Sequence, residues 1–430
     1  MNTVAWMPRR ELGALLVVLG VLVLLPLGRT SELPVLIAAV AGIGLLLRYR
    51  FAPLADAQLR LVPILFACYW LPVLLSGFGA VMPGKTWMTA LETLRFLPFA
   101  LFVAWALRKP AAWRPFELAV AAVCALWVID AWVQWLAGFS LGGAPEMERL
   151  SGIFGADNIK LGPVLAVLSP FFLLAAREHG GRFGLLVAYV LVLVPILLAG
   201  SRAAWLSFAL VTLVFGWRET RSLKRFLPLI LGALLGVALS AGLMLRDSNG
   251  FDARIERSLL ALQGTEQAID EASAGRLRIW HAAVGMIKEH PVTGVGARGF
   301  RYDYAAHAAA GDQFVDAKTR LGAAHAHQIV LELLSETGVI GLLFWLAGSV
   351  CAVRAWRRGS ADQRARAFAP GLALAVMCFP LNTHFAFYSA WWGLFFWWLL
   401  AIFCAAFVRI PQQTQSYPAD HERGADQYRP

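Results

Sequence analysis

The sequence predicts an all-α polytopic membrane protein, with about twelve transmembrane helices and one long loop outside the membrane. Of its 430 residues, 59% are hydrophobic and only 15% are charged, whereas a soluble protein carries about 25% charged residues. Water cannot solvate such a surface, so lipid must surround most of the chain. Backbone groups in lipid must pair with one another, and the spans are therefore helices. The polar stretch Arg246 to His327 is expected to carry the function.

Apolar runs that cross a hydrocarbon core of ~30 Å need about 20 residues each. The first run could pass for a signal peptide, but so many spans follow it that a retained signal-anchor helix is expected. Runs seven and eight are joined by almost nothing, which predicts a tight hairpin around Gly200 and Ser201. The twelve runs lie near residues 12–28, 33–48, 60–78, 90–107, 117–138, 159–176, 183–200, 202–217, 225–245, 332–353, 367–385 and 390–408.

The distribution of Lys and Arg predicts the direction of these spans, because short cytoplasmic loops carry an excess of both. An even number of spans places both termini on one side, which we take as the cytoplasm. The short outer loops then carry only Arg29, Lys85, Arg149, Lys160 and Arg202. The net charge of +11 follows from this topology, and no nucleic-acid partner is expected. The inner groups are Arg9/Arg10, Arg48/Arg50/Arg60, Arg108/Lys109/Arg114, Arg177/Arg182, Arg218/Arg221/Lys224/Arg225 and Arg354/Arg357/Arg358/Arg364/Arg366.

The predicted organisation has four parts. Residues 1–245 form spans one to nine, 246–327 the long outer loop, 328–410 spans ten to twelve, and 411–430 a cytoplasmic tail without fixed structure. The loop follows span nine rather than span six, and the two halves differ, which argues against a transporter of two similar halves. All five cysteines lie within apolar runs, which disfavours a disulfide framework or a zinc site.

The long loop is predicted to contain an amphipathic helix that lies along the membrane surface or caps the bundle. His290 and Pro291 mark its end, and Gly294-Val-Gly296 predicts a tight turn after it. Its apolar residues recur at helical spacing, and they are Leu277, Trp280, Val284 and Ile287.

Two histidines, His325 and His327, lie where the loop enters span ten. An i, i+2 spacing points them apart on a helix, and without a third clear ligand a metal site is disfavoured. A histidine with an unperturbed pKa near ~6.5 at a water–lipid boundary is suited to accept a proton from a hydroxyl. The plainer alternative is a hydrogen-bonded surface group. We expect His327 to begin a helical stripe of small and apolar residues, namely Leu331, Leu334, Gly338 and Gly341.

Cationic side chains are expected on the same outer face as His327. Arg202 opens span eight, Lys160 opens span six, and Arg298 and Arg301 follow the glycine turn. Guanidinium groups bind phosphate bidentately, so this cluster suits a lipid-linked diphosphate. The alternative is that each arginine anchors a helix end to lipid phosphates. His384, at the outer end of span eleven, is a candidate to orient an acceptor.

Four segments together resemble the O-antigen ligase family, which shares a domain with O-antigen polymerases and protein O-oligosaccharyltransferases. Gly200-Ser-Arg-Ala-Ala-Trp205 resembles the family's Ser-Arg at the outer start of a span. Pro291 to Phe300 resembles its Pro-x-x-Gly-x-Gly-x-x-x-Phe turn. His327-Gln328, followed by Gly338 and Gly341, resembles the ligase pattern of His, then Asn/Ser/Gln, nine residues, Gly, two residues and Gly. Arg149 to Gly162 resembles the ligases' outer loop. The resemblance covers residues 145 to 345.

The resemblance implies a metal-independent glycosyltransferase of the Gram-negative inner membrane, with its active site facing the periplasm. Such ligases transfer O-antigen glycan from undecaprenyl diphosphate to a terminal sugar of the lipid A–core, which completes lipopolysaccharide. They use no cofactor, and family precedent suggests inversion at the sugar carbon. His327 becomes the candidate base, and Arg202 and Arg298 become candidates to stabilise the departing diphosphate. The remaining candidates for substrate binding are Lys160, Arg276, Arg301, His325, His384 and Gln328.

Three alternatives remain open. An O-antigen polymerase would use the same donor and add the glycan to another lipid-linked repeat. A protein O-oligosaccharyltransferase would transfer it to Ser or Thr of a protein. A flippase or transporter would need ionisable residues along a midplane path, whereas here they gather at one face. The His327-Gln328 form of the helix motif and the Lys160-Leu-Gly segment favour the ligase.

Overall fold

The structure is a computed structural model and describes residues 9–56, 58–143, 149–156, 158–224, 226–227, 231, 264–265, 268, 270 and 273–408. Across these residues the chain is helical and forms no strand, apart from one isolated bridge between Ser140 and Gly143. The predicted all-α class is therefore confirmed. The tail 411–430, most of span 225–245 and much of the loop's first half lie outside the described residues.

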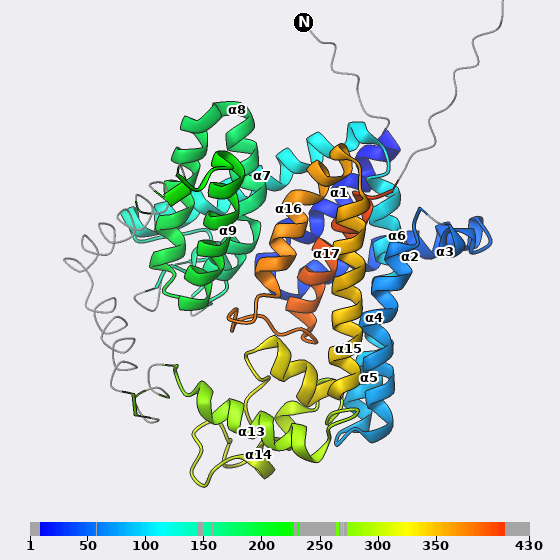
Figure 1. The fold of residues 1–430 in the computed structure, drawn as a ribbon, viewed down its shortest axis with the longest axis vertical. Helices are drawn as coiled ribbons and strands as arrows, with labels where there is room; N and C mark the ends of the chain where they lie inside the picture. The colour runs from blue at the N-terminus through cyan, green and yellow to red at the C-terminus, as the bar shows by residue number, and fades with distance from the viewer. Residues whose placement is uncertain are drawn as a thin grey trace, which may run out of the picture.

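Most of the helices run side by side as a bundle (Figure 1). Its helices up to the long loop are α1 (Arg9–Val23), α2 (Glu32–Arg48), α3 (Ala52–Ala55), α4 (Leu61–Ser76), α5 (Pro83–Thr93), α6 (Phe96–Ala106), α7 (Pro110–Ala137), α8 (Leu161–Leu198) and α9 (Arg202–Thr220). The helices from the loop onward are α13 (Arg276–Glu289), α14 (Phe300–His307), α15 (Ile329–Arg358), α16 (Ala361–Met377) and α17 (Ala390–Ala405).

Six helical stretches in the described residues are long and apolar enough to cross a membrane, so the chain is a multi-pass membrane protein. The helices α1 and α17 are apolar but shorter, and they coincide with two further expected spans, as α9 and α16 also do. The count of twelve spans stays a prediction. The six stretches are Leu25–Arg48, Leu61–Gly79, Pro83–Ala106, Pro110–Ala137, Leu161–Leu198 and Ile329–Arg358.

Helix α8 contains two of the expected spans in one helical stretch. Gly181 has φ 59° and ψ −147°, a conformation that glycine adopts without a steric penalty and that breaks the helix. The two parts on either side of this break correspond to the expected spans 159–176 and 183–200. Three residues separate the end of α8 at Leu198 from the start of α9 at Arg202, as expected for a tight hairpin.

Expected span eleven is wrong at its outer end, because α16 stops at Met377 and not near residue 385. The side-chain amide of Asn382 folds back and donates hydrogen bonds of 3.2 Å to the carbonyl oxygens of Val376 and Met377. These carbonyls belong to the last helical turn, where the regular hydrogen bonds of the helix end. Residues 378–389 therefore form an irregular segment, and His384 lies in it.

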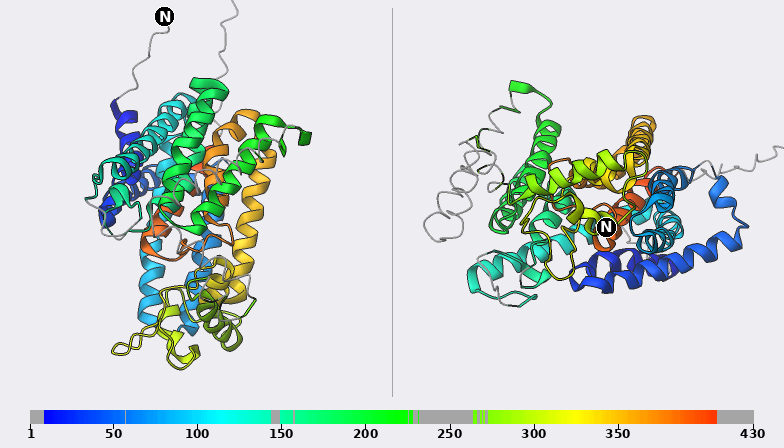
Figure 2. Two further views of the ribbon diagram at one scale, coloured as in Figure 1. Left: turned by 90° about the vertical axis from the view of Figure 1, so that its left-hand side faces the viewer. Right: turned by 90° about the horizontal axis from the view of Figure 1, so that it is seen from below.

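The central helix of the bundle is α17, whose side chains are buried almost throughout (Figure 1). It packs against α6 and α16, while α15 packs along α4. The long-loop helices α13 and α14 lie together at the lower end of the bundle in Figure 1 and in the left view of Figure 2. One end of α15 reaches this region, so α15 connects the loop helices to the membrane bundle.

The predicted amphipathic helix exists as α13 and ends at Glu289, just before His290, as expected. Of the apolar residues that recur along it, Val284 is 39% exposed. The face of α13 that is buried within the protein is a different one, and it contacts α14 and the segments that follow it. The spacing of the large apolar residues did not indicate this face. This face consists of Ile279, Ala282, Ala283 and Met286.

Candidate active site

The glycine turn of the loop is hydrogen-bonded to a break in α15. Gly338 has φ 66° and ψ −166°, which interrupts the helix and frees main-chain groups on both sides of it. The N–H of Val339 donates to the carbonyl oxygen of Pro291 at 2.9 Å, and the N–H of Val295 donates to that of Ser335 at 2.8 Å. Two motifs that lie about 40 residues apart in the sequence thus form one unit.

Glycine is required on both sides of this contact. A Cβ atom at Gly338 would lie 2.1 Å from the carbonyl oxygen of Val292, and one at Gly294 would lie 2.4 Å from the carbonyl carbon of Glu336. Both glycines also have positive φ, which other residues rarely adopt. The glycines of the two motifs are therefore explained by close approach of backbone to backbone.

The prediction that His327 and Gly338 share one face of a continuous helix is wrong. The helix begins only at Ile329, because the side-chain oxygen of Gln328 caps it by accepting the N–H of Leu331 at 2.6 Å. His327 lies before the cap with a left-handed φ of 54°. Gln328, a predicted binding residue, thus uses its oxygen within the fold, and its binding role stays a prediction.

The two histidines before α15 lie ring against ring, and the prediction that they point apart is wrong. Their ring centroids are 3.9 Å apart, and the main-chain N–H of His327 donates to Nδ1 of His325 at 3.2 Å. The prediction assumed helical backbone at both positions. The left-handed conformation of His327 removes that assumption and brings the rings together.

The ring of His327 is held in one tautomer. Its Nδ1 lies 2.8 Å from the carbonyl oxygen of Thr383 in the irregular segment after α16. Since a carbonyl oxygen only accepts hydrogen bonds, Nδ1 must be the donor, which leaves the lone pair on Nε2. An imidazole oriented in this way can take a proton from a hydroxyl that approaches Nε2.

Three histidines of the site are uncharged at neutral pH. Burial, followed by the charges of His325 and Arg276, lowers the pKa of His327 to about 3. Burial also lowers the pKa of His325 to about 4 and that of His384 to about 3, and Arg276 contributes to both. The structure thus brings all three histidines close to Arg276. Among the described residues, no group of three or more His, Cys, Asp or Glu side chains could hold a metal ion.

Two arginines from different parts of the chain meet beside the histidines. Arg276 opens α13 in the loop, and Arg202 opens α9 in the bundle, where the hydroxyl of Ser201 caps the helix by accepting the N–H of Ala204. Burial and then the charge of Arg202 lower the pKa of Arg276 to about 10. The charge of Arg202 thus acts on Arg276, and an anion bound nearby would offset this repulsion.

Arg298 approaches the histidines from the glycine turn. Its backbone is left-handed, with φ 64°, and its guanidinium Nη1 donates to the carbonyl oxygen of Tyr388 at 3.4 Å. Its charge is the second cause, after burial, that lowers the pKa of His325. Arg298 therefore joins the turn, the irregular segment and the histidine pair.

Lys160 and Arg301 are less closely tied to this centre. Nζ of Lys160 lies 4.5 Å from the ring centroid of Trp391, and burial lowers its pKa. The main-chain carbonyl of Arg301 accepts the N–H of Gly322 at 2.8 Å, which holds the loop together. Lys160 thus has an aromatic partner, and the backbone of Arg301 stabilises the loop. That either side chain binds substrate stays a prediction.

Two residues of the centre were not predicted from the sequence: Glu332 and Glu336. Both are 1% exposed and lie on α15, one turn apart. Ionisable residues within an apolar span are rare and usually functional, and this signal was available in the sequence.

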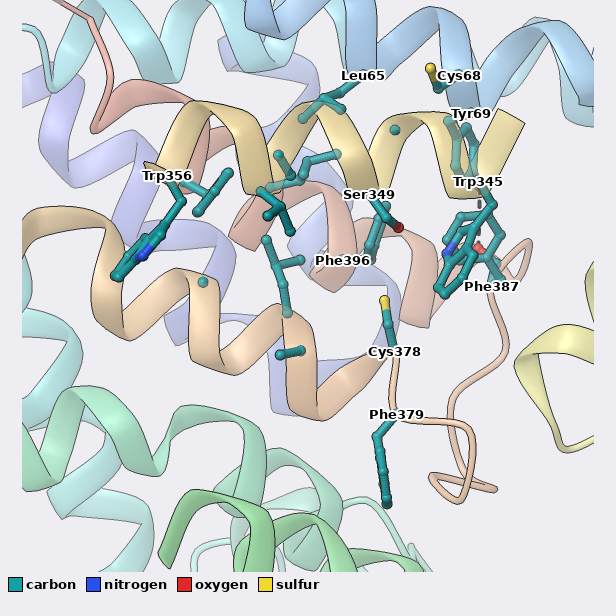
Figure 3. A pocket seen from close by; sticks show the side chains of 18 of the residues that line it. Leu65, Cys68, Tyr69, Trp345, Ser349, Trp356, Cys378, Phe379, Phe387 and Phe396 are labelled. Carbon is teal, nitrogen blue, oxygen red and sulfur yellow. Dashed lines mark hydrogen bonds between the residues drawn. The ribbon is translucent and has the colours of Figure 1, made fainter. Parts of the chain in front are cut away.

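An apolar cavity of about 520 Å³ opens between α4, α15 and α16. Trp356 lies at one end, and Tyr69, Trp345 and Phe387 gather at the other (Figure 3). The hydroxyl of Tyr69 donates to the carbonyl oxygen of Phe387 at 3.2 Å. Because the next residue, Tyr388, accepts the hydrogen bond of Arg298, the cavity ends beside the candidate active site.

Comparisons with known proteins agree with the resemblance. Residues 164–346 match the family model described as O-Antigen ligase. A candidate polysaccharide ligase of Rickettsia conorii is 25% identical over 190 residues, which is 43% of this chain and 42% of that protein. The chain thus spans less than half the length of the relative that it matches. The matched residues 164–346, which include Arg202, Arg276, Arg298 and both loop histidines, are thus similar to the domain of the O-antigen ligase family.

Proposed function

We propose that this protein is an O-antigen ligase. It transfers a glycan from undecaprenyl diphosphate to a terminal sugar of the lipid A–core, at the periplasmic face of a Gram-negative inner membrane, with both termini in the cytoplasm. The observation that carries the proposal is the position of His327: its ring is oriented by Thr383, it contacts His325, and the charge of Arg276 acts on it. Arg298 acts in the same way on His325, and Arg202 on Arg276. A base beside a cation cluster suits the displacement of a diphosphate.

His327 acts as the general base. The acceptor hydroxyl loses its proton to Nε2 of His327, and its oxygen forms the new bond to the sugar carbon. The bond from that carbon to the diphosphate oxygen breaks at the same time, and the diphosphate leaves with the electron pair. Direct displacement of this kind inverts the sugar carbon. The hydrogen bond from Nδ1 to Thr383 supports the role, because it directs the lone pair of Nε2 away from the segment 378–389.

The arginines bind the diphosphate and stabilise the charge that develops on it. Arg202 and Arg298 are the principal candidates, and Arg276 joins them because it lies beside Arg202. A bound anion offsets the repulsion between these cations and also raises the pKa of His327, because the charge of Arg276 then lowers it less. The base thus becomes stronger when the donor is present. Lys160, Arg301, His325, His384 and Gln328 are proposed to bind the substrates.

The apolar cavity supports a donor that is linked to a lipid. Its lining is formed by aromatic and aliphatic side chains, such as Trp345 and Phe396. A chain of isoprene units seated there would place its head group near Phe387 and Tyr388, within reach of Arg298. The same lipid-linked donor would serve a polymerase or a protein oligosaccharyltransferase, so the acceptor has to be tested directly.

Deletion of the gene in its own bacterium distinguishes the acceptors. Loss of a ligase leaves long polymer on its lipid carrier and unextended lipid A–core, which is the expected result. Loss of a polymerase would leave single repeats on the core. Loss of a protein-directed enzyme would spare lipopolysaccharide and remove glycan from proteins. Either of the last two profiles overturns the ligase proposal, and complementation with the intact gene is the control.

A further inference from the structure

Two buried carboxylates on α15 have no role in the transfer chemistry described above. Glu332 and Glu336 are separated by four residues, so their side chains lie on the same face of the helix. Each is 1% exposed. A charged or polar group buried in this way costs free energy unless it is paired, and such residues in a membrane helix usually serve a function.

Glu336 holds the backbone of Arg298. Its Oε2 accepts the main-chain N–H of Arg298 at 2.7 Å, the short distance expected for a hydrogen bond to a carboxylate. Arg298 is also one of the described non-glycine residues with a left-handed φ, a conformation that the surrounding structure has to maintain. With the backbone fixed, its guanidinium points to the carbonyl oxygen of Tyr388.

Glu332 lies under the histidine pair. Its Oε1 accepts the main-chain N–H of Tyr388 at 3.4 Å, and its Oε2 lies 3.5 Å from Nδ1 of His325. Within the described part of the chain this Oε2 has no hydrogen-bond partner, although it is fully buried. The carboxyl group of Glu332 thus lies beside the tilted rings of His325 and His327, where positive charge develops when the base takes its proton.

We propose that Glu332 and Glu336 are positioning residues of the active site, Glu336 through the backbone of Arg298 and Glu332 through His325 and the main chain of Tyr388. The inference rests on the proposed function, because it assigns the two carboxylates to the same transfer reaction. It extends the site from the loop into α15, so that one helix face sets the distance between the diphosphate-binding cation and the base.

The two carboxylates act differently, and conservative variants separate them. Gln at position 336 keeps an oxygen that accepts the N–H of Arg298, so Glu336→Gln should retain activity within about 10-fold, while Glu336→Ala should lose about 100-fold in kcat/KM for the donor. Gln at position 332 keeps the shape but removes the carboxyl group beside His325, which can ionise when positive charge develops on the rings. Glu332→Gln should therefore lower kcat about 10- to 100-fold and leave the donor KM unchanged.

Glu32→Gln provides the matched control. Glu32 is a carboxylate on α2 that is only partly buried, and it lies outside the site. Its side chain forms an ion pair of 2.9 Å with Arg95. This variant should retain the wild-type kcat and KM. If Glu32→Gln lost as much activity as Glu332→Gln, or if Glu336→Ala kept wild-type kinetics, the two carboxylates would have no positioning role.

A structural measurement tests the inference independently of activity. Cryo-electron microscopy of Glu336→Ala in lipid nanodiscs should show Arg298 displaced from the face of α15, with α15 itself unchanged. An unchanged Arg298 backbone overturns the inference whatever the protein transfers. Conversely, if the wild-type protein transfers no glycan but Arg298 is displaced in the variant, the proposed function fails while the positioning stands.

Discussion

The Nδ1 atom of His327 lies 2.8 Å from the main-chain carbonyl oxygen of Thr383. The two residues are 56 positions apart, one before α15 and the other after α16, and their contact closes the site between loop and bundle. It also determines which ring nitrogen carries the proton. The base chemistry proposed here depends on that assignment, because only Nε2 then offers a lone pair.

Replacing His327 should abolish transfer. Asn is the sharper substitution, because its amide nitrogen can still donate to Thr383 while nothing replaces Nε2. We expect His327→Asn and His327→Ala to lose about 10²- to 10⁴-fold in kcat, the usual contribution of a general base. Single-turnover transfer, measured on protein that still binds donor, gives the value. Near-normal transfer by His327→Asn would exclude His327 as the base.

Arg202→Lys should also be defective, although the charge is kept. A lysine ammonium is a point charge and cannot reproduce the bidentate fork that guanidinium offers to phosphate. We expect a loss of about 10- to 100-fold in kcat/KM for the donor. Arg29→Lys, an exposed arginine in the segment between α1 and α2, is the control and should behave as wild type. Equal activity of the two lysine variants would mean that Arg202 only anchors its helix.

The rate of transfer should not fall in mildly acidic solution. The pKa of His327 is lowered to about 3 in the free protein, so its ring stays neutral and able to accept a proton throughout pH 5 to 8. An ordinary histidine would be half protonated near pH ~6.5. The measurement is kcat/KM against pH, which reports groups of the free enzyme. A loss of kcat/KM with a midpoint near 6.5 contradicts the burial of this ring.

The three buried histidines, His325, His327 and His384, should each make the folded protein less stable as the solution becomes acidic. Their pKa values in the folded state are lowered to about 3 or 4, so between these values and about 6.5 the unfolded chain binds more protons. The free energy of unfolding therefore decreases as pH falls below about 6.5. Thermal unfolding in detergent at pH 7 and pH 5 measures this, and His384→Gln should weaken the dependence. An equal pH dependence of the unfolding temperature in the wild type and in His384→Gln would contradict it.

Gly338→Ala should destabilise the contact between turn and helix. The added Cβ would lie 2.1 Å from the carbonyl oxygen of Val292, and the left-handed φ of 66° is unfavourable for alanine. Overpacking and backbone strain together cost about 2–4 kcal/mol. The control is Gly13→Ala in α1, where nothing lies within 4 Å of the added atom. Similar unfolding temperatures for the two variants would show that the turn does not need this glycine.

The bundle of apolar helices and two of its turns could be predicted from the sequence. Spans are long apolar runs, and lipid allows such a run little besides a helix, so composition alone indicates them. The hairpin at Gly200 and the turn at Gly294 were likewise visible as glycines between periodic segments. These features depend on the residues of one short segment each, so they can be predicted without knowledge of contacts between distant segments.

The geometry of the site could not be predicted, because it depends on contacts between distant segments. The left-handed backbone of His327 occurs where the chain meets Thr383 and Gln328 caps α15, and a local pattern does not contain those contacts. The early end of α16 depends on the side chain of Asn382 folding back on the helix. Glu336 could have been noticed as an acidic residue in an apolar span, but its partner, Arg298, could not.

The most direct test of the central claim is transfer by the purified full chain. The wild-type protein in nanodiscs is mixed with undecaprenyl-diphosphate-linked glycan and lipopolysaccharide truncated before its glycan, without a membrane gradient and with a chelator. We predict an acceptor heavier by the mass of the glycan, and none with His327→Asn in the same lipid. If the wild-type protein forms no product in any lipid or detergent, or if His327→Asn forms as much as the wild type, the account is wrong.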